Sequence, residues 1–264
     1  MSALLDTTLS PRPWGVDALP APFVSPPGER IGEVWFTPPK ALDALLVKHL
    51  FTSEKLSVQV HPSDAQAPKG QRGKEECWLI TGAEPGATLA IGFNAPISPA
   101  ALRQAALDGS IEQLLTWYPV TAGDFFYIPA GTVHAIGPGL SLIEIQQNSD
   151  ITYRLFDYGR PRELHLDAGI AVARGEPHDP ALRRHVAATG DVTLVDGPHF
   201  RLDRLDGAAP AGTIARYRGA VLVLPLDQPL VVAGEVVSPG QCALAADLAA
   251  IEFSGRCLIA QPCG

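Results

Sequence analysis

The feature that most constrains the fold of this chain is a series of short apolar or alternating runs separated by Gly, Pro, Asn and Asp. Runs that alternate with a period of two between such turn formers are typical of antiparallel β-strands. We therefore expect a mainly β protein, built as an antiparallel sandwich or barrel. The predicted strands of the first part of the chain are residues 31–36, 42–50, 56–61, 75–81, 87–93, 124–128, 140–146 and 151–157.

Helical signals are confined to a few places. Ser98 and Pro99 favour a helix start and Gly109 favours its end, so we expect a helical insert near residues 98–118. Its second short helix is predicted at residues 111–117. A further helix is predicted at residues 164–173.

The length of 264 residues suits one elaborate domain or two small ones. We expect a first domain at residues 31–175 and a second at residues 190–264, which has the same β rhythm. The predicted strands of the second domain are residues 192–195, 200–205, 220–224, 230–237 and 250–259.

The N-terminal residues 1–30 are rich in proline, with six prolines between Ser10 and Pro27. Proline fixes φ and cannot donate a backbone hydrogen bond, which excludes a regular helix or a central strand. We therefore expect an extended strap over the surface, anchored by Trp14 and Phe23.

Charge narrows the possible partners. The chain has 20 Lys and Arg against 28 Asp and Glu, a formal net charge of -8, which disfavours nucleic acid and anionic membrane surfaces. An anionic small molecule would need Lys and Arg gathered at one place.

The N-terminus lacks a secretory signal and no stretch is apolar enough for a membrane span, so we expect a soluble cytoplasmic protein. The cysteines show no Cys-x-x-Cys pair and are expected to be reduced and structural; they are Cys77, Cys242, Cys257 and Cys263.

The most specific motif lies at residues 123–134. A predicted strand runs into a tight turn with Pro129 and Gly131, which places His134 at the start of the next strand, where its imidazole can point into a barrel. The segment resembles the second motif of the cupin fold, with Pro138 where an Asn is usual. A lone His is most often an ordinary core residue, but this spacing favours a metal ligand.

Two earlier segments offer further ligands. Strand alternation puts Ser57, Gln59 and His61 on one face, and puts Glu76 together with Lys74 and Trp78. A solvated polar strand face is the simpler alternative. Two imidazoles, one carboxylate and one amide oxygen form a donor set that suits a divalent metal such as Zn²⁺. The proposed ligands are Gln59, His61, Glu76 and His134.

Further polar residues follow His134. Alternation sets Glu144 beside Gln146, so that a carboxylate can enter the same barrel, and sets Thr152, Arg154 and Phe156 on one face of the next strand. An ordinary ion pair is the simpler reading of Arg154.

Several of these motifs together resemble the type I phosphomannose isomerases, which are metal-dependent mannose-6-phosphate isomerases of the cupin fold, in their short bacterial form. The resemblance covers about residues 10–175. It rests on the segments 12–15, 31–33, 56–62, 73–78, 128–134 and 144–160.

The resemblance implies a cupin (jelly-roll) barrel that bears the metal and the catalytic site. The C-terminal part has no paired His and Glu set, with His199 its only histidine past residue 190, so we expect a degenerate, metal-free cupin-like barrel there. The resemblance also implies zinc at Gln59, His61, Glu76 and His134, and a sugar phosphate as the small-molecule partner. Substrate-site roles are implied for Ser57, Lys74, Glu144 and Arg154, and Arg160 is a substitute for the phosphate-binding cation of longer members.

The resemblance therefore implies the interconversion of mannose 6-phosphate and fructose 6-phosphate through an enediol. The metal would stabilise the enediolate charge, with Glu144 as the base and Lys74 as a proton donor to oxygen or a ring-opening partner. Arg154, Ser57 and Arg160 would bind phosphate.

Other functions remain open at this point. The same fold could act on an unphosphorylated sugar as an isomerase or epimerase, or serve as an iron oxygenase, although Gln59 argues against the latter. A sugar-binding protein without turnover is the alternative from another class. His49 and His165 are expected to be structural or exposed.

Overall fold

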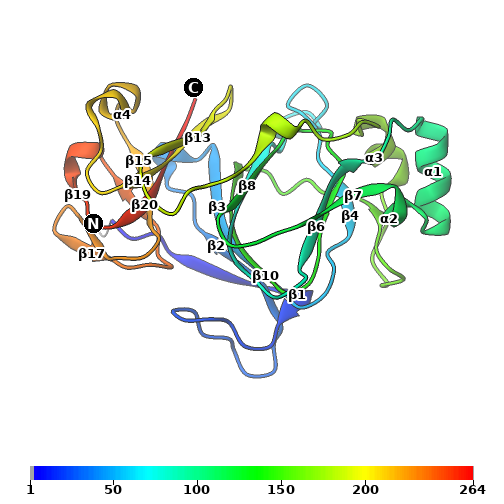
Figure 1. Cartoon of the computed structure of the whole chain (residues 1–264), viewed down its shortest axis with the longest axis horizontal. Helices are drawn as coiled ribbons and strands as arrows, with labels where there is room; N and C mark the ends of the chain where they lie inside the picture. The colour runs from blue at the N-terminus through cyan, green and yellow to red at the C-terminus, as the bar shows by residue number, and fades with distance from the viewer. Residues whose placement is uncertain (1–2, 264) are drawn as a thin grey trace.

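The computed structural model describes residues 3–263, and antiparallel strands dominate it (Figure 1). The mainly β architecture that the sequence predicts is confirmed. In the first part of the chain, a seven-stranded sheet faces a five-stranded one. The larger sheet has the order β1 (Thr7–Val16), β2 (Ile31–Phe36), β3 (Leu45–Thr52), β10 (Leu140–Gln147), β5 (Glu76–Ala83), β8 (Asp124–Ile128), β12 (Arg183–His185). The smaller has the order β11 (Tyr153–Phe156), β4 (Val58–Val60), β9 (His134–Ile136), β6 (Thr88–Phe93), β7 (Leu115–Pro119).

The two sheets enclose an apolar cluster. Trp78 and Ile80 from β5 pack there with Leu89 and Ile91 from β6. Because successive side chains of a strand point to opposite faces, the residues between them face outward.

The helices cover the outer face of the five-stranded sheet. In α1 (Pro99–Asp108), the Ser98 hydroxyl accepts a hydrogen bond from the Ala101 N–H, and Gly109 adopts a φ of 81° at the C-cap. The predicted cap and stop are therefore confirmed. Leu102 and Ala105 pack against Val58 and other apolar side chains of the sheet. The remaining helices here are α2 (Ile111–Leu114) and α3 (Leu166–Val172).

The second predicted helix of the insert, residues 111–117, is largely wrong. Only Ile111–Leu114 are helical, and the chain then extends as β7, which pairs with β6. Thr116, Trp117 and Tyr118 favour strand, and pairing with β6 overrides the short helical pattern.

The Pro-rich N-terminus differs from the expected surface strap. Its first part is β1, which pairs with β2 at the edge of the large sheet, with irregular register around Pro11. An edge strand tolerates proline because its outer side has no hydrogen-bond partner. Trp14 is buried, as an anchor would be. The first sheet thus begins before residue 31, and β12 extends it beyond residue 175.

The C-terminal strands form two further sheets around their own apolar cluster. Runs 230–237 and 250–259 each divide into two strands, since turns at Gly234 and Gly255, both with positive φ, interrupt them. The five-stranded sheet has the order β13 (Val192–Asp196), β14 (Phe200–Asp206), β20 (Arg256–Pro262), β15 (Val221–Pro225), β18 (Ala243–Ala245). The other contains β17 (Glu235–Val237), β16 (Leu230–Val232) and β19 (Ile251–Glu252). The helix of this part is α4 (Ala211–Arg216), and 3-10 turns occur at Lys40–Leu42, Pro180–Leu182 and Leu248–Ala250.

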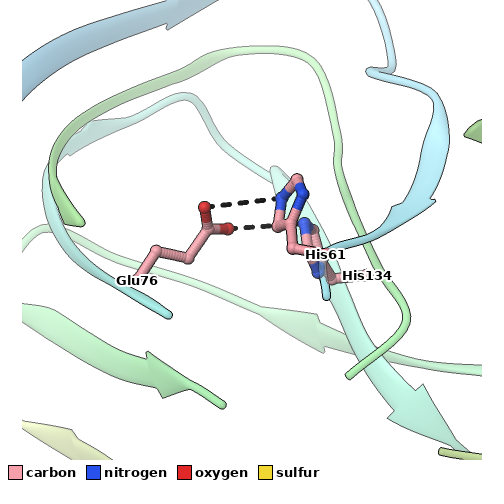
Figure 2. Close-up of side chains that lie close together, drawn as sticks. All are labelled: His61, Glu76 and His134. Carbon is pink, nitrogen blue, oxygen red and sulfur yellow. Dashed lines mark ion pairs between the residues drawn. The ribbon is translucent and has the colours of Figure 1, made fainter. Parts of the chain in front are cut away.

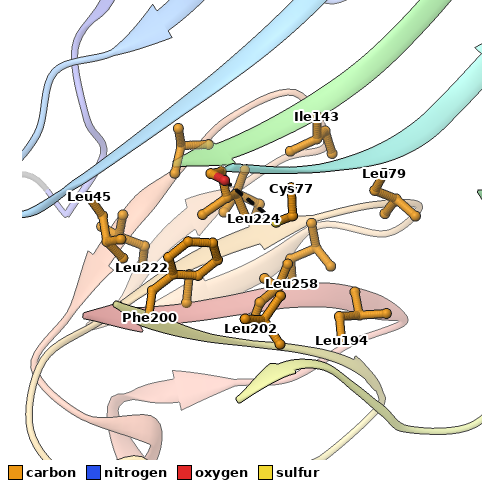
Figure 3. Close-up of a cluster of buried hydrophobic side chains, with 14 of the residues drawn as sticks. Leu45, Cys77, Leu79, Ile143, Leu194, Phe200, Leu202, Leu222, Leu224 and Leu258 are labelled. Carbon is orange, nitrogen blue, oxygen red and sulfur yellow. Dashed lines mark hydrogen bonds between the residues drawn. The ribbon is translucent and has the colours of Figure 1, made fainter. Parts of the chain in front are cut away.

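The outer face of the seven-stranded sheet packs against the C-terminal five-stranded sheet. Figure 3 shows Leu79 and Ile143 of the first sheet above Leu202 and Leu258 of the second. The large sheet therefore has an apolar outer face, while its inner face contributes both to the apolar cluster and to the cavity described below. Cys77, in this cluster, and the other three cysteines are unpaired. None of the helices within residues 3–263 has the length and apolar character needed to cross a bilayer.

Candidate metal centre and substrate cavity

Strand register aligns one set of polar side chains across the five-stranded sheet. Arg154 of β11 lies opposite Gln59 of β4, and Gln59 lies opposite His134 of β9. Directly paired residues of neighbouring strands project from the same face. The register therefore brings these three residues to the inner face together.

A second row crosses the seven-stranded sheet. Lys48 of β3 pairs with Glu144 of β10, which pairs with Trp78 of β5. Lys48 Nζ donates to Glu144 Oε1 over 3.0 Å, and Trp78 Nε1 donates to Glu144 Oε2 over 3.0 Å. Both oxygens of the carboxylate are thus held by cross-strand neighbours.

His61, Glu76 and His134 form a buried group whose ligand atoms all lie within 4.8 Å of one another. Figure 2 shows the carboxylate facing the two imidazoles. Glu76 Oε2 lies 3.5 Å from His61 Nε2, and Glu76 Oε1 lies 3.4 Å from His134 Nε2. A tetrahedron with metal–ligand distances of about 2.0–2.1 Å has edges of about 3.3–3.4 Å. The two separations, one to each carboxylate oxygen, are close to this edge length, so the three residues are near enough to share one cation.

Each imidazole is oriented by its other nitrogen. His61 Nδ1 lies 2.8 Å from the Ile151 carbonyl oxygen, and His134 Nδ1 lies 2.9 Å from that of Thr132. An Nδ1–H that donates to a carbonyl leaves the Nε2 lone pair free, as metal-binding histidines require. Burial, with the nearby Lys74 and His134, lowers the pKa of His61, and burial lowers the pKa of His134 to about 4. Both rings are therefore neutral at pH 7.

The Glu76 carboxylate supports the same reading. It is fully buried, and within residues 3–263 neither of its oxygens accepts a hydrogen bond, although Lys74 Nζ lies 3.0 Å from Oε2. Burial raises the pKa of Glu76 to about 7, against the opposing effect of Lys74. A carboxylate that is buried in this way requires a cation or a proton. The donor set therefore fits a divalent metal ion.

Gln59 is adjacent to this group. Its Nε2 lies 3.3 Å from His134 Nε2, and its Oε1 accepts a hydrogen bond from Ser57 Oγ over 3.2 Å. Rotation of the amide by 180° exchanges these two atoms and presents the oxygen, which is the atom that a metal ion binds.

Glu144 has a different electrostatic environment from Glu76. Burial alone would raise its pKa, but the ammonium groups of Lys48 and Lys74 and the hydrogen bonds from Lys48 and Trp78 lower it to about 2. In turn, Glu76 and Glu144 outweigh the effect of burial and raise the pKa of Lys74. The site therefore combines an ionised carboxylate with charged lysines.

Gln59, Lys48, Lys74 and Glu144 border a cavity of about 460 Å³ between the two sheets. Polar residues dominate its walls, and it holds several cationic side chains on a chain of negative net charge. The lining residues with charged or hydrogen-bonding side chains include Arg12, Glu33, Lys48, Ser57, Gln59, Lys74, Glu144, Asp150, Thr152, Arg154, Arg162, Glu163 and His165.

The structure brings together most of the residues that the sequence singles out, but not Arg160. The Arg160 guanidinium binds Asp157, Glu54 and the Lys55 carbonyl oxygen instead, and it does not line the cavity. The residues brought together are Ser57, Gln59, His61, Lys74, Glu76, His134, Glu144 and Arg154.

The expectation for Phe156 is wrong. A register irregularity between Arg154 and Phe156 turns the latter to the outer face, where it packs near Gly109 of the helical layer. A β-bulge breaks the alternation on which the expectation depended.

Sequence reasoning also missed several cavity residues. Lys48 was signalled only as a charged residue beside His49 in the predicted strand 42–50, and Arg162 only as one of several arginines after β11. His49 is buried among aromatic rings, as its structural reading predicts, whereas His165 lines the cavity, where its Nδ1 accepts a hydrogen bond from the Arg154 N–H.

Comparison with known proteins agrees with the resemblance noted in the sequence. The chain is 47% identical over 136 residues to mannose-6-phosphate isomerase of Streptococcus mutans, a match that covers 48% of this chain and 43% of that protein. It is 46% identical over 137 residues to mannose-6-phosphate isomerase of Bacillus subtilis, with the same coverage. In these alignments the chain spans about half the length of the curated relatives that it matches. No protein-family model matches the chain.

The fold is shared with a solved structure. The mannose 6-phosphate isomerase from Bacillus subtilis superimposes with a TM-score of 0.76 at 24% identity, over 98% of each chain. At this identity the likeness establishes the fold, and the expected fold class is confirmed. The resemblance to phosphomannose isomerases that the motifs predict is confirmed as well.

Proposed function

We propose that this chain is a metal-dependent aldose–ketose isomerase that interconverts mannose 6-phosphate and fructose 6-phosphate through an enediol. The observation that carries the proposal is the buried group of His61, Glu76 and His134 beside a cavity bordered by Glu144 and Lys74. The names of the relatives support the same reaction. The matches cover 43% of each of these two relatives, so their names support the reaction through that shared part.

His61, Glu76 and His134 would hold the metal ion, with the amide oxygen of Gln59 as a fourth ligand, and the donor set suits Zn²⁺. Bound there, the ion supplies Lewis-acid stabilisation to the oxygen atoms of the reacting carbons.

Glu144 serves as the base that moves the proton between the two carbons. Its low pKa keeps it ionised, and the hydrogen bonds from Lys48 and Trp78 fix its orientation. A carboxylate with such a pKa is a weak base at neutral pH. As negative charge develops on the enediolate, the ammonium groups of Lys48 and Lys74 also stabilise that charge. They then stabilise the ionised form of Glu144 less, so the basicity of Glu144 rises.

Lys74 and Arg154 act on the oxygen atoms of the sugar phosphate. Lys74 remains protonated beside Glu76, so it can donate a proton or a hydrogen bond to a sugar oxygen. Arg154 and Ser57 line the cavity at positions suited to an anionic group. Binding this remote group orients the sugar for reaction.

A coupled assay for fructose 6-phosphate formation, before and after chelation and with metal content measured, tests the proposal. Activity should disappear with the metal and return when Zn²⁺ is added. We expect Glu76→Gln to lose both bound metal and turnover, because it removes the anionic ligand. The matched variant Glu144→Gln should retain the metal but lose at least about 100-fold in kcat, the usual contribution of a general base.

Full activity in metal-free protein would refute the metal-dependent mechanism. A fully active Glu144→Gln variant would remove Glu144 as the base, and its metal content would show whether the centre itself is intact.

A further inference from the structure

A second cavity, of about 290 Å³, lies where the chain passes from the first half to the C-terminal strands. Its walls include residues 79–81 at the end of β5, residues 185–188 between β12 and β13, Arg204 of β14 and Arg256 of β20. The charged or titratable side chains among its walls are those two arginines and His185, and within residues 3–263 no Asp or Glu lines it. None of these residues lines the cavity beside the candidate metal centre.

Arg204 is a buried cation without a counterion. It is only 4% exposed, and in the described part of the chain it forms no ion pair. Its Nη1 donates to the Ala187 carbonyl oxygen and its Nη2 to that of Gly190, which are neutral backbone groups between β12 and β13. Its Nε has no hydrogen-bond partner among residues 3–263. A buried charge is costly unless an opposite charge compensates it, and the walls of the cavity supply none.

Arg256 and His185 each keep one nitrogen without a partner in the described structure. Arg256 Nε donates to Asp227 Oδ2 and its Nη1 to the Ala188 carbonyl oxygen, each over 2.8 Å, and its Nη2 makes no hydrogen bond. His185 Nδ1 lies 2.8 Å from Asp124 Oδ1, and its Nε2 makes none. Neither aspartate lines the cavity. Arg256 therefore offers a free N–H group to a ligand, and His185 offers Nε2–H when it is protonated.

We propose that this cavity binds a small oxyanion, either phosphate or a short dicarboxylate. Arg204 contributes its uncompensated charge, and Arg256 contributes a direct donor whose planar geometry suits both kinds of anion. The volume is at the lower end of the range for ligand sites, about 300–1,000 Å³, which restricts the ligand to a few non-hydrogen atoms. Because the walls come from both halves of the chain, the bound anion joins them. The site does not depend on the proposed isomerase reaction.

The test follows amide proton–nitrogen NMR spectra of the metal-loaded full chain during titration with inorganic phosphate and, separately, with succinate. We expect saturable shifts of the amides of residues 79–81 and 185–188 with at least one of these anions. The tighter of the two identifies the ligand as a phosphate or a carboxylate. Sodium chloride at equal ionic strength should not produce the shifts. Phosphate bound beside the metal centre is distinguished because it shifts other amides.

Arg256→Gln should raise the Kd measured at these amides by about tenfold, the factor for losing a charge-assisted hydrogen bond. Arg201→Gln is the matched control. Both arginine side chains are 35% exposed, and each binds an aspartate through Nε and a backbone carbonyl through Nη1. Arg201 does not line this cavity, so its substitution should leave the Kd within about threefold of the wild-type value.

Asp227→Asn separates a contact with the anion from a structural role of Arg256. It removes the negative charge that competes for the Arg256 guanidinium but keeps the guanidinium itself. The anion should therefore bind about two- to fivefold more tightly, the size expected for a partly exposed ion pair. If Arg256 acted only by holding the Ala188 carbonyl group, this variant would bring no gain.

Absence of saturable shifts with both anions, or equal shifts with sodium chloride, would overturn the site. So would an unchanged Kd in Arg256→Gln, or equal losses in Arg256→Gln and Arg201→Gln. If Arg256→Gln does not fold, Asp227→Asn decides, and affinity that stays the same or falls in that variant would reject the proposal.

Discussion

At the scale of single residues, Lys48 illustrates what a buried charge does in this site. Its ammonium group is almost inaccessible to solvent and is held by Glu144 and by Gln146 Oε1, the latter over 2.7 Å. It also lies 4.4 Å from the centre of the Trp35 ring. These contacts offset the loss of hydration and place a fixed positive charge beside the proposed base.

Lys48→Met should shift the acid limb of the pH profile of kcat/KM to higher pH. Removal of the ammonium raises the pKa of Glu144 from its low value, so the carboxylate becomes protonated, and activity is lost, at a higher pH. The measurement is a pH–rate profile of metal-loaded enzyme, with metal content as the control. An acid limb that does not move would contradict this role of Lys48.

The sequence predicts the candidate metal ligands more completely than the rest of the site. His61, Glu76 and His134 occur in recognisable local motifs, so strand alternation is enough to bring them inward. Lys48 lies outside those motifs, and only the pairing of β3 with β10 brings it to Glu144. That pairing joins positions 96 residues apart, which local patterns do not reveal.

At the scale of elements, β3 shows how one strand serves two environments. Lys48 faces the cavity, whereas the next residue, His49, packs on the opposite face against Phe23, Phe36 and Phe51. Burial in this aromatic setting lowers the pKa of His49 to about 4. The folded state therefore favours the neutral ring.

His49→Phe should reduce the acid sensitivity of folding. Below an unfolded-state pKa of about 6.5, the unfolded chain takes up a proton that the folded state binds only near pH 4, so stability falls as the pH decreases through this window. This accounts for about 2 kcal/mol between pH 7 and pH 5. Denaturant unfolding of both proteins at these two pH values measures it, and equal pH dependence would contradict the assignment.

Alternation predicts most strands, but it does not locate irregularities. The bulge beyond Arg154 reverses the direction of Phe156, and β7 replaces the expected end of a helix because β6 offers it a partner. Both differences arise from pairing with another strand. Local sequence carries little information about such pairing.

At the scale of the whole molecule, the C-terminal sheets reach the segments that carry the candidate metal ligands. His199, in the turn between β13 and β14, lies 3.5 Å from Asp64 and 3.6 Å from Glu75, measured from its ring nitrogens to carboxylate oxygens. Tyr127 also donates a hydrogen bond to Glu75. Asp64 and Glu75 are close in sequence to His61 and Glu76, so this contact restrains both segments.

His199→Ala should accelerate release of the metal to a chelator by a factor of about two to five, the size expected for loss of a partly exposed polar contact. His185→Ala is the matched control, because His185 pairs with Asp124 at a more exposed position. Release is followed with a chromogenic chelator. Identical release rates in the two variants would show that the C-terminal contact does not restrain the metal-binding segments.

Because both faces of the seven-stranded sheet are packed or line the cavity, the alternation of side chains along its strands limits how this molecule can be redesigned. Along β3, β5 and β10, alternate side chains face inward, where Lys48, Leu50 and Glu144 line the cavity and others enter the inner apolar cluster, while the positions between them pack against the C-terminal sheet. A single inserted or deleted residue within one of these strands would turn every later inward-facing side chain of that strand outward, and every outward-facing one inward. The lining of the cavity and the packing between the two halves would then be lost together, so variants of these strands should be made by substitution and not by insertion or deletion.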